Sequence, residues 1–258
     1  MSTDQGGPVQ KQPGDAIALP IGDLAQRTSA SRSIARMVET RALTPRELES
    51  RRLIYRDDAA PDTANAFREI RTRLLALGDA RNFISMVTPV SPKSGGSFVA
   101  RNLAAAFAFD EAKTALLIDC NLRQPAQHKA LGIEPAQGGL IDYLEEPEIE
   151  IQNVLYRTGI PRLRLIPAGR QREMSAEYFS SFRLRTLLDS LRHRYADRYI
   201  FLDGPSMKGA PDARILSDLA DFVVVVAAYG RDTASSISQA IAGFDPAKIA
   251  GVVFNHVP

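Results

Sequence analysis

The sequence has 258 residues, of which 45% are hydrophobic, and its 32 basic and 30 acidic residues leave a net charge of +2. This length predicts one α/β domain with an appendage, and the balanced charge excludes a general affinity for nucleic acid. No run approaches the ~18 apolar residues of a membrane-spanning helix, and residues 1–15 hold no apolar signal core. The one cysteine, Cys120, ends an apolar run and is expected to be a buried packing residue. We therefore expect a cytoplasmic protein.

The first 60 residues differ in composition from the rest of the chain. Residues 1–20 are rich in Gly, Pro and Gln, which predicts a disordered tail. Residues 21–60 are expected to form an Arg-rich helical appendage and linker, with a capping box from Thr44 to Glu47. Its arginines fit either a solvated helical face or a surface that docks to an acidic partner or an anionic membrane. Residues 61–258 are expected to form the main domain.

A glycine loop lies between an apolar run and a helical pattern in residues 83–102, FISMVTPVSPKSGGSFVARN. The order strand, glycine loop, helix is the context of a phosphate-binding loop, because free backbone N–H groups and a helix N-terminus attract anions. In the Walker pattern G-x-x-x-x-G-K-[ST], Ser97 takes the hydroxyl position and Gly95 the glycine, but Gly96 stands where the lysine belongs. Taken alone, the loop fits equally well an ordinary turn in which glycines supply backbone freedom.

Apolar runs and helical patterns alternate along the rest of the chain. The runs are mostly continuous, as in strands that are covered on both faces. This alternation predicts a doubly wound, mostly parallel sheet whose ligands bind at the carboxyl ends of the strands. The strands are expected in residues 83–87, 115–118, 163–166, 199–202, 222–227 and 249–254, and the helices in residues 63–77, 97–107, 176–195, 212–219 and 233–242.

Two acidic residues close apolar runs, Asp119 after LLI and Asp203 after YIFL. Carboxylates at the ends of buried strands beside a phosphate loop suit Mg²⁺ coordination, directly or through water. Either aspartate taken singly fits a residue that caps the following turn. The two together with the glycine loop favour a nucleotide site.

Several longer segments resemble a known family in sequence and in order. They are AFREIRTRL, the loop before FVARNLA, LLIDCNLRQP, GLIDYLEE, RTGIPRLRLIPAGR, YIFLDGPS and GVVFNHV. The chain from residue 65 to residue 257 resembles the cytoplasmic kinase domain of bacterial tyrosine kinases (BY-kinases) of exopolysaccharide and capsule loci, most closely the exosortase-associated autokinases. The resemblance implies a P-loop NTPase-like fold of the deviant P-loop group, with ATP or ADP and Mg²⁺ as ligands.

The resemblance also implies roles for individual residues. Ser97, Asp119 and Asp203 would hold Mg²⁺, and the two aspartates would be the catalytic acids. Asn255 would contact the adenine base. The residues implied to contact the nucleotide are Lys93, Ser94, Gly95, Gly96, Ser97, Phe98, Arg123 and Asn255.

The resemblance further implies partners. Arg68 and Arg71 match an oligomerisation helix, although on their own they fit a solvated face as well. The family works with a membrane polysaccharide co-polymerase, so we expect that partner and a homo-oligomer or a hetero-oligomer with an active BY-kinase. No nucleic-acid partner is expected. The protein would then lie at the inner membrane peripherally, through its partner.

The chain departs from the family at the charges that matter for phosphoryl transfer. Gly96 replaces the phosphate-loop lysine, and Asn121 replaces the second acid of D-x-D, where an amide cannot act as a base. Asn65 and Ser206 are further departures, and we expect no tyrosine cluster after Pro258. A lysine bound to phosphate contributes ~1.5–3 kcal/mol, so its loss is expected to weaken a micromolar site roughly ten- to a thousandfold.

These departures favour a pseudokinase that acts by binding, as a regulatory or scaffolding subunit of polysaccharide export. An active autokinase that uses Lys93 and another base is the first alternative. A partitioning-type ATPase is the second, and it is disfavoured because Ser91 occupies the position of that group's signature lysine.

Overall fold

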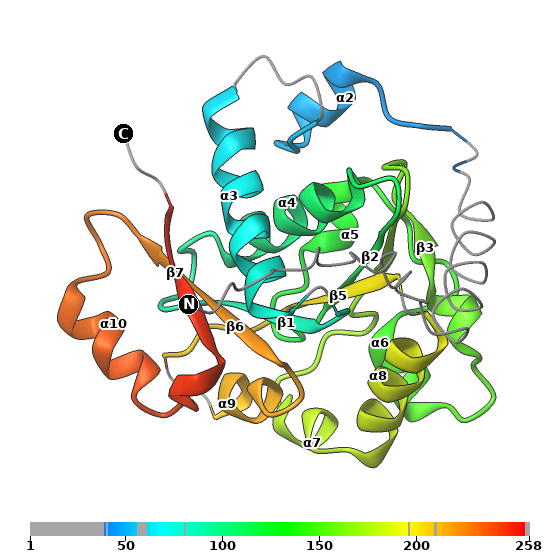
Figure 1. Ribbon diagram of the computed structural model, residues 1–258. Helices are drawn as coiled ribbons and strands as arrows, with labels where there is room; N and C mark the ends of the chain where they lie inside the picture. Colours follow the sequence, from blue (N-terminus) through cyan, green and yellow to red (C-terminus); the bar gives the residue numbers. More distant parts are fainter. Residues whose placement is uncertain are drawn as a thin grey trace, which may run out of the picture.

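The computed structural model describes residues 39, 41–55, 61–79, 81–195, 197–208 and 211–255. A seven-stranded sheet forms its centre, with helices on both faces (Figure 1). The strands are β1 (Ile84–Pro89), β2 (Thr114–Asp119), β3 (Tyr156–Arg157), β4 (Leu163–Ile166), β5 (Arg198–Asp203), β6 (Phe222–Ala228) and β7 (Ile249–Asn255). The helices are α2 (Pro45–Ser50), α3 (Pro61–Leu77), α4 (Gly96–Ala108), α5 (Gln127–Leu131), α6 (Leu140–Glu145), α7 (Ala176–Phe179), α8 (Phe182–Arg194), α9 (Asp212–Ser217) and α10 (Ala234–Ile241), with 3₁₀ turns at Ile151–Val154 and Pro246–Lys248.

The strand order is β3-β4-β2-β5-β1-β6-β7, and every pair is parallel except β3 with β4. The doubly wound, mostly parallel sheet predicted from the apolar runs is therefore confirmed. Strand β5 lies between β1 and β2, and Asp119 pairs in register with Asp203. The strand that leads into the glycine loop and the two strands that end in aspartates are thus neighbours.

Two hydrophobic cores cover the two faces of the sheet. Alternate residues of each strand enter different cores, so that in β2 Leu116 and Ile118 face one and Ala115 and Leu117 the other. Helices α3, α4 and α5 cover one face, and α6 to α9 cover the other (Figure 1). Burial on both faces explains why the runs are continuous rather than alternating. Cys120 is fully buried, as predicted.

Two elements differ from the sequence prediction. Residues 176–195, predicted as one helix, form α7 and α8 with a break at Ser180 and Ser181. Ser181 has extended backbone angles, and its hydroxyl accepts a hydrogen bond from the Leu184 N–H at 3.2 Å, so it caps a new helix. The antiparallel strand β3 was not predicted, because its two residues are too short a run to show a period.

Residues 41–55, called the strap below, pack against the domain. The capping box predicted from Thr44 to Glu47 is present at the start of α2. Beyond α2, Leu53 and Ile54 are buried in the core that contains α4. The Asn102 amide of α4 holds this end of the strap, because it donates to the Arg52 carbonyl at 3.0 Å and accepts from the Ile54 N–H at 2.8 Å.

The predicted tail, residues 1–20, and the predicted helical spacing in residues 34–38 lie outside the described residues. Among the helices that the structure describes, none is both long enough and apolar enough to cross a membrane.

Candidate nucleotide-binding site

The glycine loop runs from the end of β1 into the N-terminus of α4. Lys93 and Gly95 both have left-handed backbone angles, with φ of 65° and 89°, and these turn the chain tightly before the helix. Gly95 is the N-cap and offers no side-chain cap to the first turn of the 13-residue helix. First-turn N–H groups have no partner within a helix, so the start of α4 is suited to an anion.

The loop is held in place by Asp232, which follows β6 and which sequence reasoning missed. Its carboxylate accepts hydrogen bonds from the hydroxyls of Ser91 at 2.6 Å and Ser94 at 2.7 Å, and from the Ala228 N–H at 2.8 Å. Although burial opposes the effect, the bonds from Ser91, the Ala228 N–H and Ser94 lower the pKa of Asp232. Arg231 adds a bond to the Ser94 hydroxyl at 2.7 Å. The charged carboxylate therefore fixes the shape of the loop.

Gly96 lies against the ring of Pro89. A Cβ atom placed on Gly96 would be 2.6 Å from Pro89 Cδ and 2.9 Å from Cγ. Contacts below 3.0 Å require a shift, and a proline ring at the end of a buried strand cannot swing aside as a flexible side chain does. The position that holds lysine in the Walker pattern therefore has no room for any side chain while Pro89 is present.

Asp119 and Asp203 lie side by side beneath the loop, and both are fully buried. Asp119 accepts hydrogen bonds from three backbone N–H groups, those of Asn121 at 3.2 Å and of Ala126 and Gln127 at 3.0 Å each. Burial and the neighbouring Asp203 charge raise the pKa of Asp119 to about 8. Burial also raises the pKa of Asp203 to about 6, against hydrogen bonds from Gln127 and Ser97. Because both pKa values are raised, the two carboxyl groups tend to retain a proton near neutral pH.

Gln127 connects all three residues that were predicted to bind the metal, and sequence reasoning missed it. Its N–H binds Asp119, and its side-chain Nε2 donates to Asp203 Oδ2 at 2.6 Å and to the Ser97 carbonyl at 2.9 Å. The side chain is fully buried. No local sequence pattern marks this glutamine, because its partners come from two strands and the glycine loop.

A cavity of about 640 Å³ opens above the loop and is lined with cations. The residues around it include Arg52, Pro89, Lys93, Gly95, Gly96, Ser97, Phe98, Arg101, Asn121, Arg123, Lys208 and Asn255. Arg52 comes from the strap, and Arg52, Arg101 and Lys208 were not predicted. Because five lysines and arginines line it, the cavity carries positive charge without a lysine at position 96.

The predicted contact residues divide into two groups. Most of them line the cavity, but Ser94 is buried beneath the loop and bonded to Asp232. Asn255 also lines the cavity, and its Nδ2 donates to the Ser94 carbonyl at 3.1 Å. Asp119 and Asp203 are not among the described residues that line the cavity.

The predicted interface arginines lie on α3. Arg68 donates to Asn65 of the same helix at 2.8 Å. Arg71 donates to the Ala106 carbonyl of α4 at 3.1 Å and lies 3.7 Å from the Asp110 carboxylate. Arg71 therefore has a role within the domain, because it joins α3 to the end of α4.

The oxygen atoms near the loop are of the kind that Mg²⁺ prefers, a hydroxyl at Ser97 and carboxylates at Asp119 and Asp203. No group of three or more His, Cys, Asp or Glu side chains with metal-site geometry occurs among the described residues. P-loop sites complete the shell with water and phosphate oxygens, so a small protein donor set fits the ion. In this chain, however, the Gln127 amide already hydrogen-bonds to Asp203.

The parallel sheet, the glycine loop at the start of α4 and the paired strand-end aspartates define a domain with a P-loop NTPase-like fold. The cell division ATPase MinD of Pyrococcus furiosus shares this fold, with a TM-score of 0.52 at 20% identity over 66% of this chain and 70% of MinD. No protein-family model matches the sequence.

Comparison with known proteins identifies the family. The tyrosine-protein kinase wzc of Salmonella typhimurium is 32% identical over 195 residues, 74% of this chain and 26% of wzc. The putative tyrosine-protein kinase EpsB of Ralstonia solanacearum is 33% identical over 193 residues, 74% of this chain and 25% of EpsB. The kinase domain of the Escherichia coli tyrosine kinase ETK superposes with a TM-score of 0.69 at 26% identity, covering 84% of this chain and 88% of that domain.

The BceF tyrosine kinase domain is similar in structure at 26% identity and a TM-score of 0.67, and it covers 92% of this chain and 90% of that domain. The chain belongs to the BY-kinase family and has the fold of its cytoplasmic kinase domain. It spans about a quarter of the length of the curated relatives that it matches.

Proposed function

We propose that the chain is a nucleotide-binding pseudokinase of an exopolysaccharide or capsule export system, where it acts as a regulatory or scaffolding subunit. The observation that carries this proposal is the contact between Gly96 and Pro89, which leaves no room for the phosphate-loop lysine. The cation-lined cavity supports retained binding of a phosphorylated nucleotide. Mg²⁺, where it binds in such folds, supplies charge neutralisation at the phosphates.

The residues around the cavity support binding more than catalysis. Lys93, Arg123 and Lys208 line the cavity and attract phosphate charge. A tyrosine hydroxyl must lose its proton to attack phosphate, and Asn121 has no basic group to accept it. Asp119 and Asp203 are fully buried, so neither contacts a substrate hydroxyl in this arrangement.

A restoration series tests the proposal. Radiolabelled ATP with the purified protein should give no tyrosine autophosphorylation above that of Asp119→Asn. Gly96→Lys alone should gain nothing, because the side chain meets Pro89, and Gly96→Ala is the matched control for that clash. Combining Gly96→Lys with Pro89→Gly and Asn121→Asp should tighten ATP binding about tenfold or more, with the lysine supplying most of the gain.

One second candidate, an active autokinase, is favoured by a single observation, namely that Lys93 lines the cavity. The native protein would then autophosphorylate, and Lys93→Ala would abolish the activity. That pair of results would refute the pseudokinase proposal.

For partners, we propose a membrane polysaccharide co-polymerase, together with self-association or association with an active BY-kinase, which would place the protein peripherally at the inner membrane. Helix α3 is the proposed contact, through Arg68 and Arg71. Arg68→Glu is the sharper test, because Arg71 also joins α3 to α4. It should abolish self-association or co-purification while the thermal unfolding midpoint stays within about 2 °C, as expected for a surface substitution. Unchanged assembly would make α3 an ordinary solvated helix.

A further inference from the structure

Gln127 occupies a position in the site that a conventional description of a P-loop does not explain. It begins α5, is fully buried, and uses both its backbone N–H and its side-chain amide on the two aspartates. The second hydrogen bond of its side chain goes to the Ser97 carbonyl, in the first turn of α4. A single residue thus bonds the ends of β2 and β5 and the helix that follows the glycine loop.

The chemistry of these contacts resembles that of a hydrated cation. An ionised carboxylate is only an acceptor, and in a magnesium site such an acceptor takes hydrogen bonds from the water bound to the ion. The Gln127 Nε2 group is also a donor, and its distance of 2.6 Å to Asp203 Oδ2 is that of a strong, charge-assisted bond. The amide therefore donates to Asp203 Oδ2 in the manner of a metal-bound water, while Oδ1 of the same carboxylate is buried without a hydrogen-bond partner among the described residues.

The same arrangement separates the acids from the cavity. Ser97, Asn121 and Ala126 line the cavity, whereas Asp119, Asp203 and Gln127 are fully buried behind them. The positive charge in contact with the cavity comes from side chains instead, including Lys93, Arg123 and Lys208. Phosphate oxygens in the cavity thus meet protein cations and lie apart from the carboxylates that would hold an ion.

We propose that Gln127 takes the place of the hydrated magnesium ion, so that this cavity binds a nucleoside di- or triphosphate without a divalent cation. The inference rests on the proposed nucleotide binding and specifies its cation requirement. It assigns Gln127 as a positioning residue that acts through Asp203 and Ser97.

Calorimetry with the full chain and ADP, in buffer with Mg²⁺ and in buffer with EDTA, tests the proposal. The dissociation constants of the native protein should agree within about twofold, and Gln127→Ala should bind ADP about tenfold or more weakly in EDTA than in Mg²⁺. Gln239→Ala, an exposed glutamine on α10, is the matched control and should behave like the native protein. Circular dichroism checks that each variant is folded.

Binding of Mn²⁺, followed by electron paramagnetic resonance in the presence of ADP, gives a second readout. Gln127→Ala should bind the ion and the native protein should not. If the native protein binds ADP at least tenfold more tightly in Mg²⁺ than in EDTA, the inference is wrong and the proposed function stands. Absence of ADP binding in both buffers would overturn the nucleotide-binding proposal, and this inference with it.

Discussion

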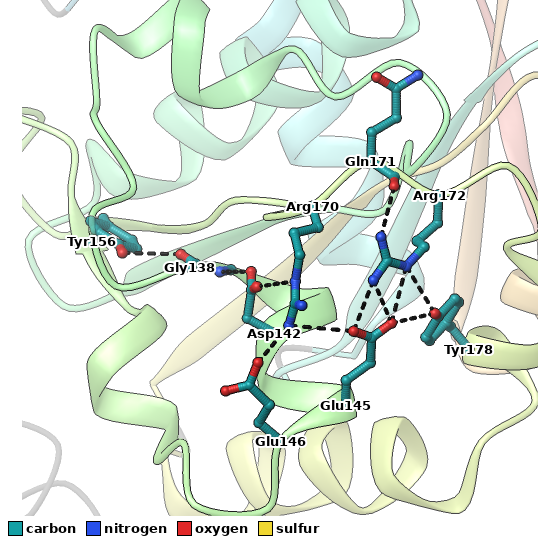
Figure 2. Close-up of polar contacts among 10 residues, drawn as sticks. Gly138, Asp142, Glu145, Glu146, Tyr156, Arg170, Gln171, Arg172 and Tyr178 are labelled. Atoms are coloured by element: carbon teal, nitrogen blue, oxygen red, sulfur yellow. Dashed lines mark hydrogen bonds and ion pairs between the residues drawn. The ribbon is translucent and has the colours of Figure 1, made fainter.

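Two groups of carboxylates in the described part of the chain lie in opposite electrostatic settings. In the surface network of Figure 2, the side chains of α6 meet arginines that follow β4. Glu145 accepts hydrogen bonds from the Tyr178 hydroxyl at 2.5 Å and from Arg172 at 2.8 Å, and these bonds lower the pKa of Glu145 against the opposing effect of burial. Arg170 pairs with Asp142 at 2.6 Å in the same network. Every one of these carboxylates has a cation beside it.

At the candidate nucleotide site the setting is reversed. Asp119 and Asp203 are fully buried, and their hydrogen-bond donors are backbone N–H groups for Asp119 and the Gln127 side-chain amide for Asp203. Burial raises the pKa of both groups, to about 8 and about 6. Exposed ion pairs cost little and contribute little to stability, whereas buried carboxylates without a paired cation are expected to dominate the response to substitution and to pH.

The largest effect is expected for Asp232→Ala, which removes the carboxylate that holds the glycine loop. Two hydroxyl bonds and one backbone bond to a charged group are lost, and the free energy of unfolding should fall by about 2–4 kcal/mol. Urea unfolding measures the loss. Asp245→Ala, which removes one bond to the Ala247 N–H at the surface, is the control and should cost no more than about 1 kcal/mol. Equal losses in the two variants would show that the loop does not depend on Asp232.

A pH-dependent effect of intermediate size is expected from the acid pair. Because the folded-state pKa values are raised, the folded protein keeps protons that the unfolded chain releases, so stability falls as the pH rises through about 6 and about 8. Asp203→Asn retains an oxygen for Gln127 and removes the charge. Its thermal unfolding midpoint should exceed that of the native protein at pH 8 and differ less at pH 5. Parallel midpoint curves between pH 5 and pH 9 would contradict the raised pKa values.

The smallest effect is expected at the surface network. Glu145→Gln keeps the size of the side chain and removes the charge that faces Arg172. Since exposed ion pairs are largely screened, the thermal unfolding midpoint should change by less than about 2 °C, and salt should reduce even that difference. A fall in the free energy of unfolding as large as that expected for Asp232→Ala would contradict the difference between the exposed ion pairs and the carboxylates of the candidate site.

The parts of the fold that sequence predicted are those with local signals. Continuous apolar runs predicted the strands, and the aspartates that close two runs meet at the same edge of the sheet because parallel strands end together. Gln127 and Asp232 could not be predicted in this way, since their bonds to the glycine loop and to Asp203 join groups that are 30 to 141 residues apart in the sequence. The steric pairing of Gly96 with Pro89 was also invisible, although the two are seven positions apart, because only the folded loop brings them into contact.

The bond between Asn102 and the strap determines where a shortened protein can begin. A version that starts at residue 61, the expected domain boundary, would lack the Arg52 carbonyl and the Ile54 N–H, and the buried Asn102 amide would keep only its bond to the Phe98 carbonyl of its own helix. It would also expose the part of the core that Leu53 and Ile54 cover, next to α4. The unit suited to crystallisation or labelling therefore begins before Thr44, ahead of the cap of α2.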